Sequence, residues 1–203
     1  MSRMADCTSV VLLLGDPFTV CGELTRTLAS LKNIGSRFEV LLVCDGPAWK
    51  REPAVQSFLV HGPRPGLLQT RSCVDHPAPL IHLALDWLRT PYLHLLWPGV
   101  AFRAENTARL CDALDHIPEV AVAVGMGGVT AHGAVLRASA VQANGLCLEQ
   151  SSQSTLDQEI GNLGEVLMLP SVECDEPRWS WTDYPFLKRW PTRVAGNRVR
   201  VAA

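Results

Sequence analysis

Acidic residues able to bind a ligand follow two apolar runs of the sequence. Asp16 comes shortly after residues 10–14, and the pair Asp45 and Gly46 comes directly after residues 38–44. A carboxylate at such a position accepts hydrogen bonds from N–H or O–H donors, such as those of a nucleobase or a ribose. Asp-Pro and Asp-Gly pairs are also ordinary turn formers that end a strand. Both interpretations of these residues stay open.

Other groups with catalytic potential lie in the second half of the chain or stand alone. Asp157 and Glu159 are weak candidates for a general base, and acids on a solvated helix face are the alternative. His82, His94 and His132 lack the H-x-H or H-x-x-x-H spacing of a metal site. We therefore expect no metal and no resident cofactor, with catalytic residues unknown.

Strands and helices that alternate along the chain must position these residues. Continuous apolar runs predict buried strands, and apolar residues at three- and four-residue steps predict amphipathic helices. The predicted strands are 9–14, 38–44, 55–60, 92–96, 120–124, 134–136 and 166–169, and the predicted helices are 21–32, 80–88, 105–116 and 138–143. This order indicates an α/β fold with a mostly parallel sheet and helices on both faces. In such sheets, ligands bind at the carboxyl ends of the strands.

Four segments, in this order, resemble the nucleotide-sugar half of family-2 glycosyltransferases with the GT-A fold. Residues 10–31 end in Thr-Leu-Ala-Ser-Leu, which is similar to the family's T-L-x-S-L pattern. Residues 43–47 resemble its D-D-G-S strand end, and 83–96 and 103–114 resemble its later elements. The resemblance implies one Rossmann-like GT-A domain over residues 1–176. It also implies a nucleotide sugar as ligand, with Asp16, Asp45 and Gly46 as nucleotide-binding residues.

The same resemblance places the family's D-x-D metal motif on Trp97, Pro98 and Gly99. Such enzymes usually neutralise the departing diphosphate with a divalent cation held by the two carboxylates. Tryptophan, proline and glycine side chains offer no oxygen ligand. We therefore expect a degenerate motif, no metal, and metal-dependent transfer that is doubtful or lost, as in a pseudoenzyme.

Aromatic residues crowd the predicted tail, residues 177–203. They are Trp179, Trp181, Tyr184, Phe186 and Trp190. Because aromatic side chains dominate interface energetics, the segment favours contact with a protein partner or with a second copy, and folding back over the core is the alternative. A non-catalytic scaffold or interaction protein built on the GT-A fold is thus a second hypothesis. An unrelated α/β nucleotide-binding enzyme is a third.

The composition narrows the range of partners and compartments. The formal net charge is −2 and no long run of one sign occurs, so nucleic-acid binding is not expected. The early apolar run is too short for a signal peptide or a membrane span. Seven cysteines are scattered without a C-x-x-C pair, which is typical of a reducing compartment and predicts a cytoplasmic protein.

Overall fold

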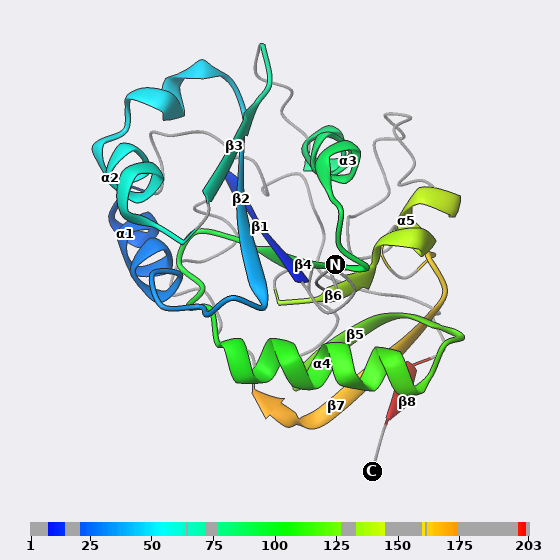
Figure 1. Ribbon diagram of the computed structural model, residues 1–203. Coiled ribbons are helices and arrows are strands. Elements are labelled where there is room, and N and C mark those ends of the chain that lie inside the picture. The colour runs from blue at the N-terminus through cyan, green and yellow to red at the C-terminus, as the bar shows by residue number, and fades with distance from the viewer. Residues whose placement is uncertain are drawn as a thin grey trace, which may run out of the picture.

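The computed structural model describes residues 8–14, 21–63, 65–71, 77–126, 133–144, 160, 162–173 and 199–201. These residues form an α/β fold around one eight-stranded sheet with the order β3-β2-β1-β4-β6-β5-β7-β8 (Figure 1). The strands are β1 (Thr8–Leu14), β2 (Phe38–Cys44), β3 (Pro65–Gln69), β4 (Tyr92–Leu96), β5 (Val120–Met126), β6 (Val135–Arg137), β7 (Glu165–Glu173) and β8 (Val199–Val201). Only β6 runs antiparallel to its neighbours, β4 and β5. The predicted, mostly parallel sheet is confirmed.

The central strands are buried because their sequences are apolar on both faces. Every residue of β4 is buried, and so is all of β2 except the partly exposed Glu39. In the parallel register, Leu14 lies opposite Cys44 and Leu12 lies opposite Leu96. The carboxyl ends of β1, β2 and β4 therefore lie at one edge of the sheet, which we call the carboxyl edge.

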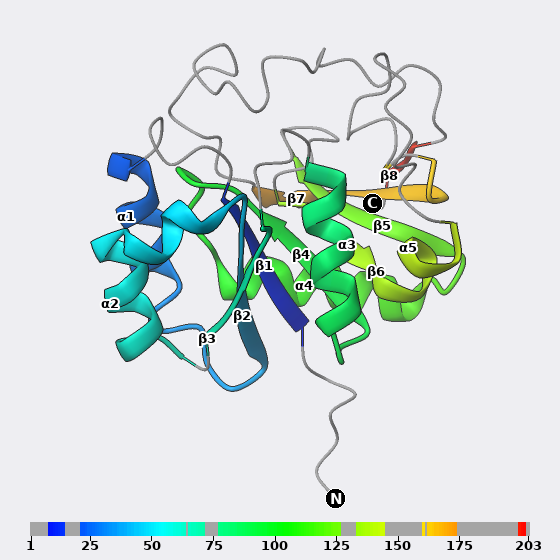
Figure 2. The same cartoon turned by 90° about the horizontal axis from the view of Figure 1, so that it is seen from above.

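Helices cover both faces of the sheet, as the sequence predicts. They are α1 (Cys21–Ser30), the 3₁₀ helix η3 (Pro47–Arg51), α2 (Pro53–His61), α3 (Pro77–Trp87), α4 (Ala104–His116) and α5 (Ala138–Asn144). Figures 1 and 2 show α4 on one face, α3 and α5 on the opposite face, and α1 and α2 together beside β2 and β3. None of the helices in the described ranges is long and apolar enough to cross a bilayer.

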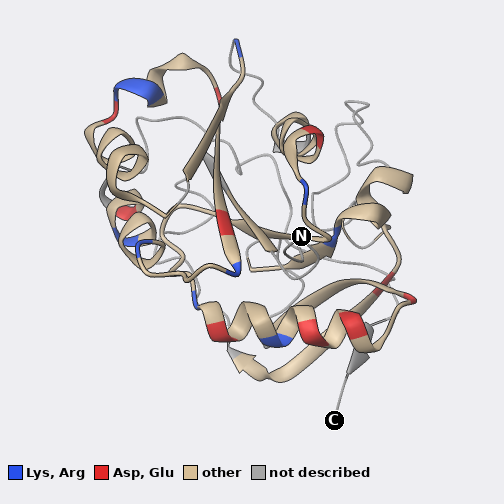
Figure 3. Ribbon diagram, viewed as in Figure 1, with Lys and Arg blue, Asp and Glu red and all other residues tan. Residues whose placement is uncertain are grey.

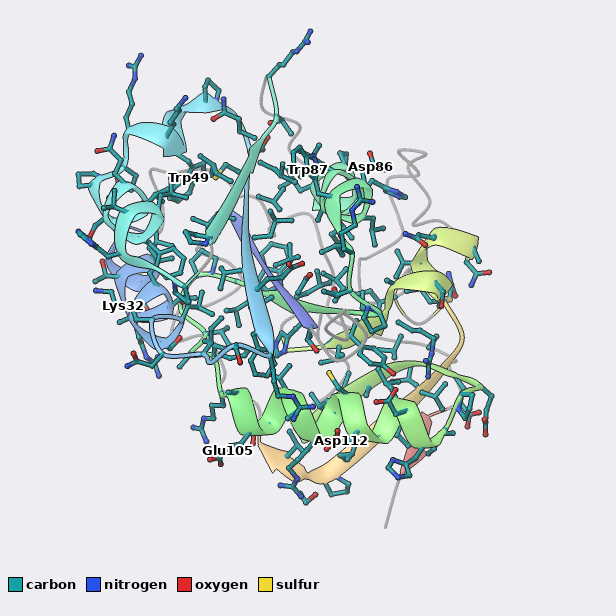
Figure 4. The ribbon with its side chains drawn as sticks, viewed as in Figure 1. Lys32, Trp49, Asp86, Trp87, Glu105 and Asp112 are labelled. Carbon is teal, nitrogen blue, oxygen red and sulfur yellow. The ribbon has the colours of Figure 1, made fainter. Side chains whose placement is uncertain are left out.

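In α4, the longest of the described helices, the sequence pattern determines which face is buried. Its buried residues, Thr107, Leu110, Cys111 and Leu114, recur at three- and four-residue steps and pack against β5, β6 and β7. Its acids are exposed; Figure 4 labels two of them, and Figure 3 shows the recurring acidic segments along the helix. This packing fixes the position of the segment that connects β4 to α4.

The strand predicted at residues 55–60 is wrong, because this segment belongs to helix α2. Val55 and Phe58 are buried while Gln56 and Ser57 are exposed, which is a helical spacing and not the alternation of a strand. Pro53 occupies the first turn, where proline favours a helix start. The apolar composition of the segment had concealed this period.

Two strands were not predicted, and each lies at an edge of the sheet. β3 begins with Pro65, which an edge strand tolerates at its first position because no partner needs its missing N–H. β8 pairs in parallel with β7 at the other edge. Residues 174–198 lie outside the described ranges, so the boundary between domain and tail at residues 176 and 177 stays a prediction.

Candidate functional site

Asp45 directly follows β2 at the carboxyl edge, and the neighbouring strand holds it in place. The hydroxyl of Thr70, which follows β3, donates to Asp45 Oδ1 at 3.2 Å and accepts the Gly46 N–H at 2.7 Å. The Thr70 N–H donates to the Cys44 carbonyl at 3.0 Å. Asp45 is only 3% exposed, and a buried carboxylate is stable only when it is hydrogen-bonded. The contacts of Thr70 therefore orient the carboxyl group.

Gly46 is needed for the turn that follows Asp45. Its φ is 81°, in a region that glycine reaches without steric cost and other residues rarely adopt. The chain then enters η3, whose Trp49 is fully buried and is labelled in Figure 4. The acid-glycine pair thus forms a turn and also sets a fixed carboxylate at the carboxyl edge.

The segment after β4, residues 97–103, is tied to helix α1 by hydrogen bonds. The Gly99 N–H donates to Thr27 Oγ1 at 2.9 Å, and the Phe102 N–H donates to Ser30 Oγ at 2.9 Å. Arg26 Nη1 donates to the Gly99 carbonyl at 3.2 Å. Thr27 and Ser30 are the polar residues of the Thr-Leu-Ala-Ser-Leu pattern. Their local role is to bind the backbone of this segment.

A divalent cation does not fit residues 97–99. Trp97, Pro98 and Gly99 are all buried, and their side chains carry no oxygen. Gly99 has a φ of 93°, so a residue with a side chain would be strained there. Among the residues that the structure describes, no cluster of three or more His, Cys, Asp or Glu residues that could hold a metal ion occurs. No chemical step is therefore assigned to a metal at this position.

Two titratable groups near the carboxyl edge stay neutral at pH 7. Burial raises the pKa of the Cys44 thiol to about 12, so it is not a nucleophile. Burial lowers the pKa of His94 to about 4, and its Nδ1 lies 2.9 Å from Thr107 Oγ1. A cavity of about 30 Å³ beside His94, against α4, has room for a water molecule but not for a nucleotide. Neither group therefore supplies a charge or a nucleophile at pH 7.

The structure brings five of the predicted site residues to the carboxyl edge. They are Asp45, Gly46, Trp97, Pro98 and Gly99. The other predicted residues, Asp16, Asp157 and Glu159, lie outside the described ranges, as do Trp179, Trp181, Tyr184, Phe186 and Trp190. Their roles stay predictions.

Sequence reasoning missed Thr70 and Arg26 as residues of this edge. Thr70 follows β3, a strand that was not predicted, so nothing in the sequence pointed to its contact with Asp45. Arg26 directly precedes the Thr-Leu-Ala-Ser-Leu pattern and lies on the predicted helix. In a parallel sheet, the helix that follows the first strand packs against the sheet near that strand. This topology was the signal that could have pointed to Arg26.

Comparisons with known proteins provide information on the fold of this chain. No protein-family profile and no curated protein matches the sequence. Solved structures do match. The mannosyltransferase PcManGT from Pyrobaculum calidifontis, in complex with GDP-Man and Mn2+, is similar with a TM-score of 0.68 and 12% identity, over 85% of this chain and 57% of that chain. The chain has a GT-A-like glycosyltransferase fold.

A second group of similar structures comes from S. aureus TarS. The complex of TarS 1-349 with UDP has a TM-score of 0.60 and 14% identity, over 78% of this chain and 55% of that chain. TarS itself has a TM-score of 0.64 and 14% identity, over 83% of this chain and 36% of that chain. The chain therefore spans 57% or less of the length of each of these three structures. At these identities the likeness concerns the fold alone.

Proposed function

We propose that this chain binds a nucleotide sugar at the carboxyl edge, around Asp45, without a divalent cation at residues 97–99. The observation that carries the proposal is the buried Asp45 carboxylate at the carboxyl edge, which is hydrogen-bonded to Thr70. We propose that this carboxylate accepts a hydrogen bond from the base or the ribose. Ligands of parallel α/β sheets bind at this end of the strands. The similar structures with UDP and with GDP-Man support a nucleotide as the ligand class.

Whether glycosyl transfer accompanies binding is a separate part of the proposal. A departing diphosphate needs positive charge, and residues 97–99 supply no ligands for a metal that would provide it. We therefore propose that metal-dependent transfer is absent. Asp157 and Glu159 remain the candidates for a general base. The scattered cysteines, of which Cys44 and Cys111 are free and buried, fit a reducing compartment such as the cytoplasm.

The experiment is a titration of the native chain with UDP and with GDP, each in EDTA and in Mn²⁺, followed by calorimetry and by thermal unfolding. A ligand that binds only the native state raises its stability by mass action. We expect binding that does not depend on Mn²⁺, and we expect Asp45→Asn to weaken it at least tenfold, because a hydrogen bond to a charged group is lost. Glu52→Gln, a partly exposed acid on the same stretch of chain, is the matched control.

A donor-hydrolysis assay with UDP- and GDP-sugars tests the chemistry. Turnover that rises with Mn²⁺ and disappears with EDTA would contradict the proposed loss of metal dependence. Failure of every nucleotide to bind would contradict the proposed function itself. That result would favour the second candidate, a scaffold built on this fold, for which the absence of metal ligands at residues 97–99 is the specific observation.

A further inference from the structure

A buried histidine on β4 uses only one of its two ring nitrogens for hydrogen bonding within the described part of the chain. His94 is 6% exposed, and its Nδ1 lies 2.9 Å from Thr107 Oγ1 on α4. The other ring nitrogen, Nε2, makes no hydrogen bond to any residue that the structure describes. Because a buried polar atom without a partner costs free energy, the surroundings of Nε2 need an explanation.

The hydroxyl of Thr107 decides which ring nitrogen of His94 carries the proton. This hydroxyl has one proton, and its oxygen also lies 3.2 Å from the carbonyl oxygen of Arg103, which can only accept. If the proton went to His94 instead, two oxygen acceptors would face each other at that distance with no hydrogen between them. Thr107 therefore donates to the Arg103 carbonyl, four positions earlier in the chain, and accepts the N–H of His94 Nδ1.

Nε2 of His94 is then a hydrogen-bond acceptor without a proton. Burial lowers the pKa of His94 to about 4, so the ring is neutral at pH 7 and carries only the proton on Nδ1. His94 lines a cavity of about 30 Å³ between β4, residues 100–103 and α4, and within the described ranges its Nε2 is not sealed off from water. A molecule in this cavity can therefore reach the lone pair of Nε2.

The size and the polar groups of the cavity select water as the ligand. About 30 Å³ admits a molecule of that size, and Nε2 requires a ligand that donates a hydrogen bond. Arg103 and Asn106 line the same cavity and carry N–H donors, from which the oxygen of the water can accept. The charge of Arg103 disfavours a metal cation, and the described residues include no cluster of three or more His, Cys, Asp or Glu able to hold one.

We propose that His94, as the Nδ1–H tautomer, binds one ordered water molecule through Nε2 in the cavity between β4 and α4. The water adds a second connection between the strand and the first turn of the helix, beside the direct bond from His94 to Thr107. The site does not involve Asp45, so the inference is independent of the proposed nucleotide binding.

NMR of the histidine ring nitrogens in the isotope-labelled full chain at pH 7 tests the tautomer. A ring nitrogen without a proton resonates far downfield of a protonated one, so we expect a downfield signal from His94 Nε2 and an upfield signal from its Nδ1. His94→Gln identifies both signals by their loss. His61→Gln, at an exposed residue of α2, is the matched control that leaves them in place. The reversed pattern, with the proton on Nε2, overturns the inference.

The variants Thr107→Val and Thr107→Ser test what fixes the proton. Valine cannot accept the N–H of Nδ1, so we expect the two nitrogen signals of His94 to move toward each other as the tautomers mix. Serine keeps the hydroxyl and should keep the wild-type pattern. An unchanged pattern in Thr107→Val would contradict the role of the hydroxyl and overturn the inference. If Thr107→Val does not fold, the wild-type spectrum still decides.

Magnetisation transfer from water to the His94 ring tests the ligand. We expect a nuclear Overhauser effect with the sign of a long-lived bound water at the Hδ2 proton, which neighbours Nε2 and is distant from the exchangeable proton on Nδ1. The same effect should be lost in Thr107→Val to the extent that the proton moves to Nε2 and the acceptor disappears. A wild-type chain that shows the Nδ1–H tautomer but no bound water would mean that the cavity is empty, and the inference would be wrong.

Discussion

Thr70 orients the carboxyl group of Asp45, because its hydroxyl contacts both that carboxylate and the backbone N–H of Gly46. One hydroxyl serves as donor to Asp45 and as acceptor from Gly46. Removing it leaves a nearly buried carboxylate and a backbone N–H each short of one hydrogen bond. An unsatisfied buried polar group costs about 1–3 kcal/mol, more if it is charged. A residue at the end of an edge strand therefore controls the proposed site.

Thr70→Val removes the hydroxyl but keeps the shape of the side chain. We expect the free energy of unfolding to fall by about 1–3 kcal/mol and the affinity for UDP or GDP to fall severalfold, because Asp45 loses its fixed orientation. Thr70→Ser, which keeps the hydroxyl, should retain most of the affinity. Urea denaturation and calorimetry measure the two quantities. Unchanged nucleotide affinity in Thr70→Val would contradict the positioning role.

Secondary structure at the centre of the sheet could be predicted because its sequence pattern has only one consistent interpretation. β1, β2 and β4 are continuous apolar runs, and burial on both faces leaves no other place for them. α2 was mistaken for a strand because a short apolar run does not distinguish the two periods. β3 was missed because Pro65 and Gly66 usually mark a turn, and only its edge position makes them acceptable.

The connection between α1 and residues 97–103 illustrates what sequence reasoning could not reach. The Thr-Leu-Ala-Ser-Leu pattern was visible, but its partners lie more than seventy residues away. Hydrogen bonds from a side chain to a distant backbone depend on the crossover geometry and leave no local signal. Asp45 could be predicted because strand ends of a parallel sheet share one edge. The contact of Thr70 with Asp45 and the contact of Arg26 with Gly99 left no such local signal.

Thr27→Val should release the segment after β4 from α1. Thr27 is fully buried, and valine has nearly the same shape but cannot accept the Gly99 N–H. We expect the Gly99 amide to exchange with solvent much faster, while the amide of Leu95, which bonds to the Ala134 carbonyl, keeps its protection. Hydrogen exchange followed by NMR measures both. Thr27→Ser is the control, and equal protection of Gly99 in all three proteins would refute the proposed connection.

In the part of the chain that the structure describes, the core residues form two groups, one around the central strands and one between α4 and the sheet. Because β8 pairs with β7, residues that follow the predicted tail aromatics in the sequence join the sheet. A partner contact by Trp179, Trp181, Tyr184, Phe186 and Trp190 is therefore better tested by substitution than by deletion. Truncation would also remove β8.

Replacing Trp179 and Trp181 together by alanine should change association more than folding. If the aromatic segment contacts a second copy, we expect the variant to sediment as a smaller species at a concentration where the wild-type chain associates, with a similar melting temperature. Trp87→Ala is the control, because Trp87 is exposed at the end of α3. A wild-type monomer whose double variant unfolds at a much lower temperature would place these aromatics in the core.

His94 couples the stability of the whole molecule to pH. It lies on β4, bonds to Thr107 on α4, and contacts the ring of Phe102, with Arg103 lining the same small cavity. Burial lowers its pKa from 6.5 to about 4, so between these values the unfolded chain binds a proton that the folded chain excludes. The free energy of unfolding must then decrease as the pH falls through this range, by up to about 3 kcal/mol, with the full loss reached below about pH 4.

The variant His94→Gln isolates this contribution, because glutamine can bond to Thr107 but does not titrate. Urea denaturation at pH 7, 6, 5 and 4.5 should give a flatter decline for His94→Gln than for the wild-type chain, since every other titrating group is common to both. The variant is expected to be less stable at pH 7, where neutral His94 packs well, and to approach the wild type as the pH falls. His61→Gln, at an exposed residue of α2, is the matched control for the substitution. Parallel curves for His94→Gln and the wild type would mean that His94 gains its proton without unfolding the chain.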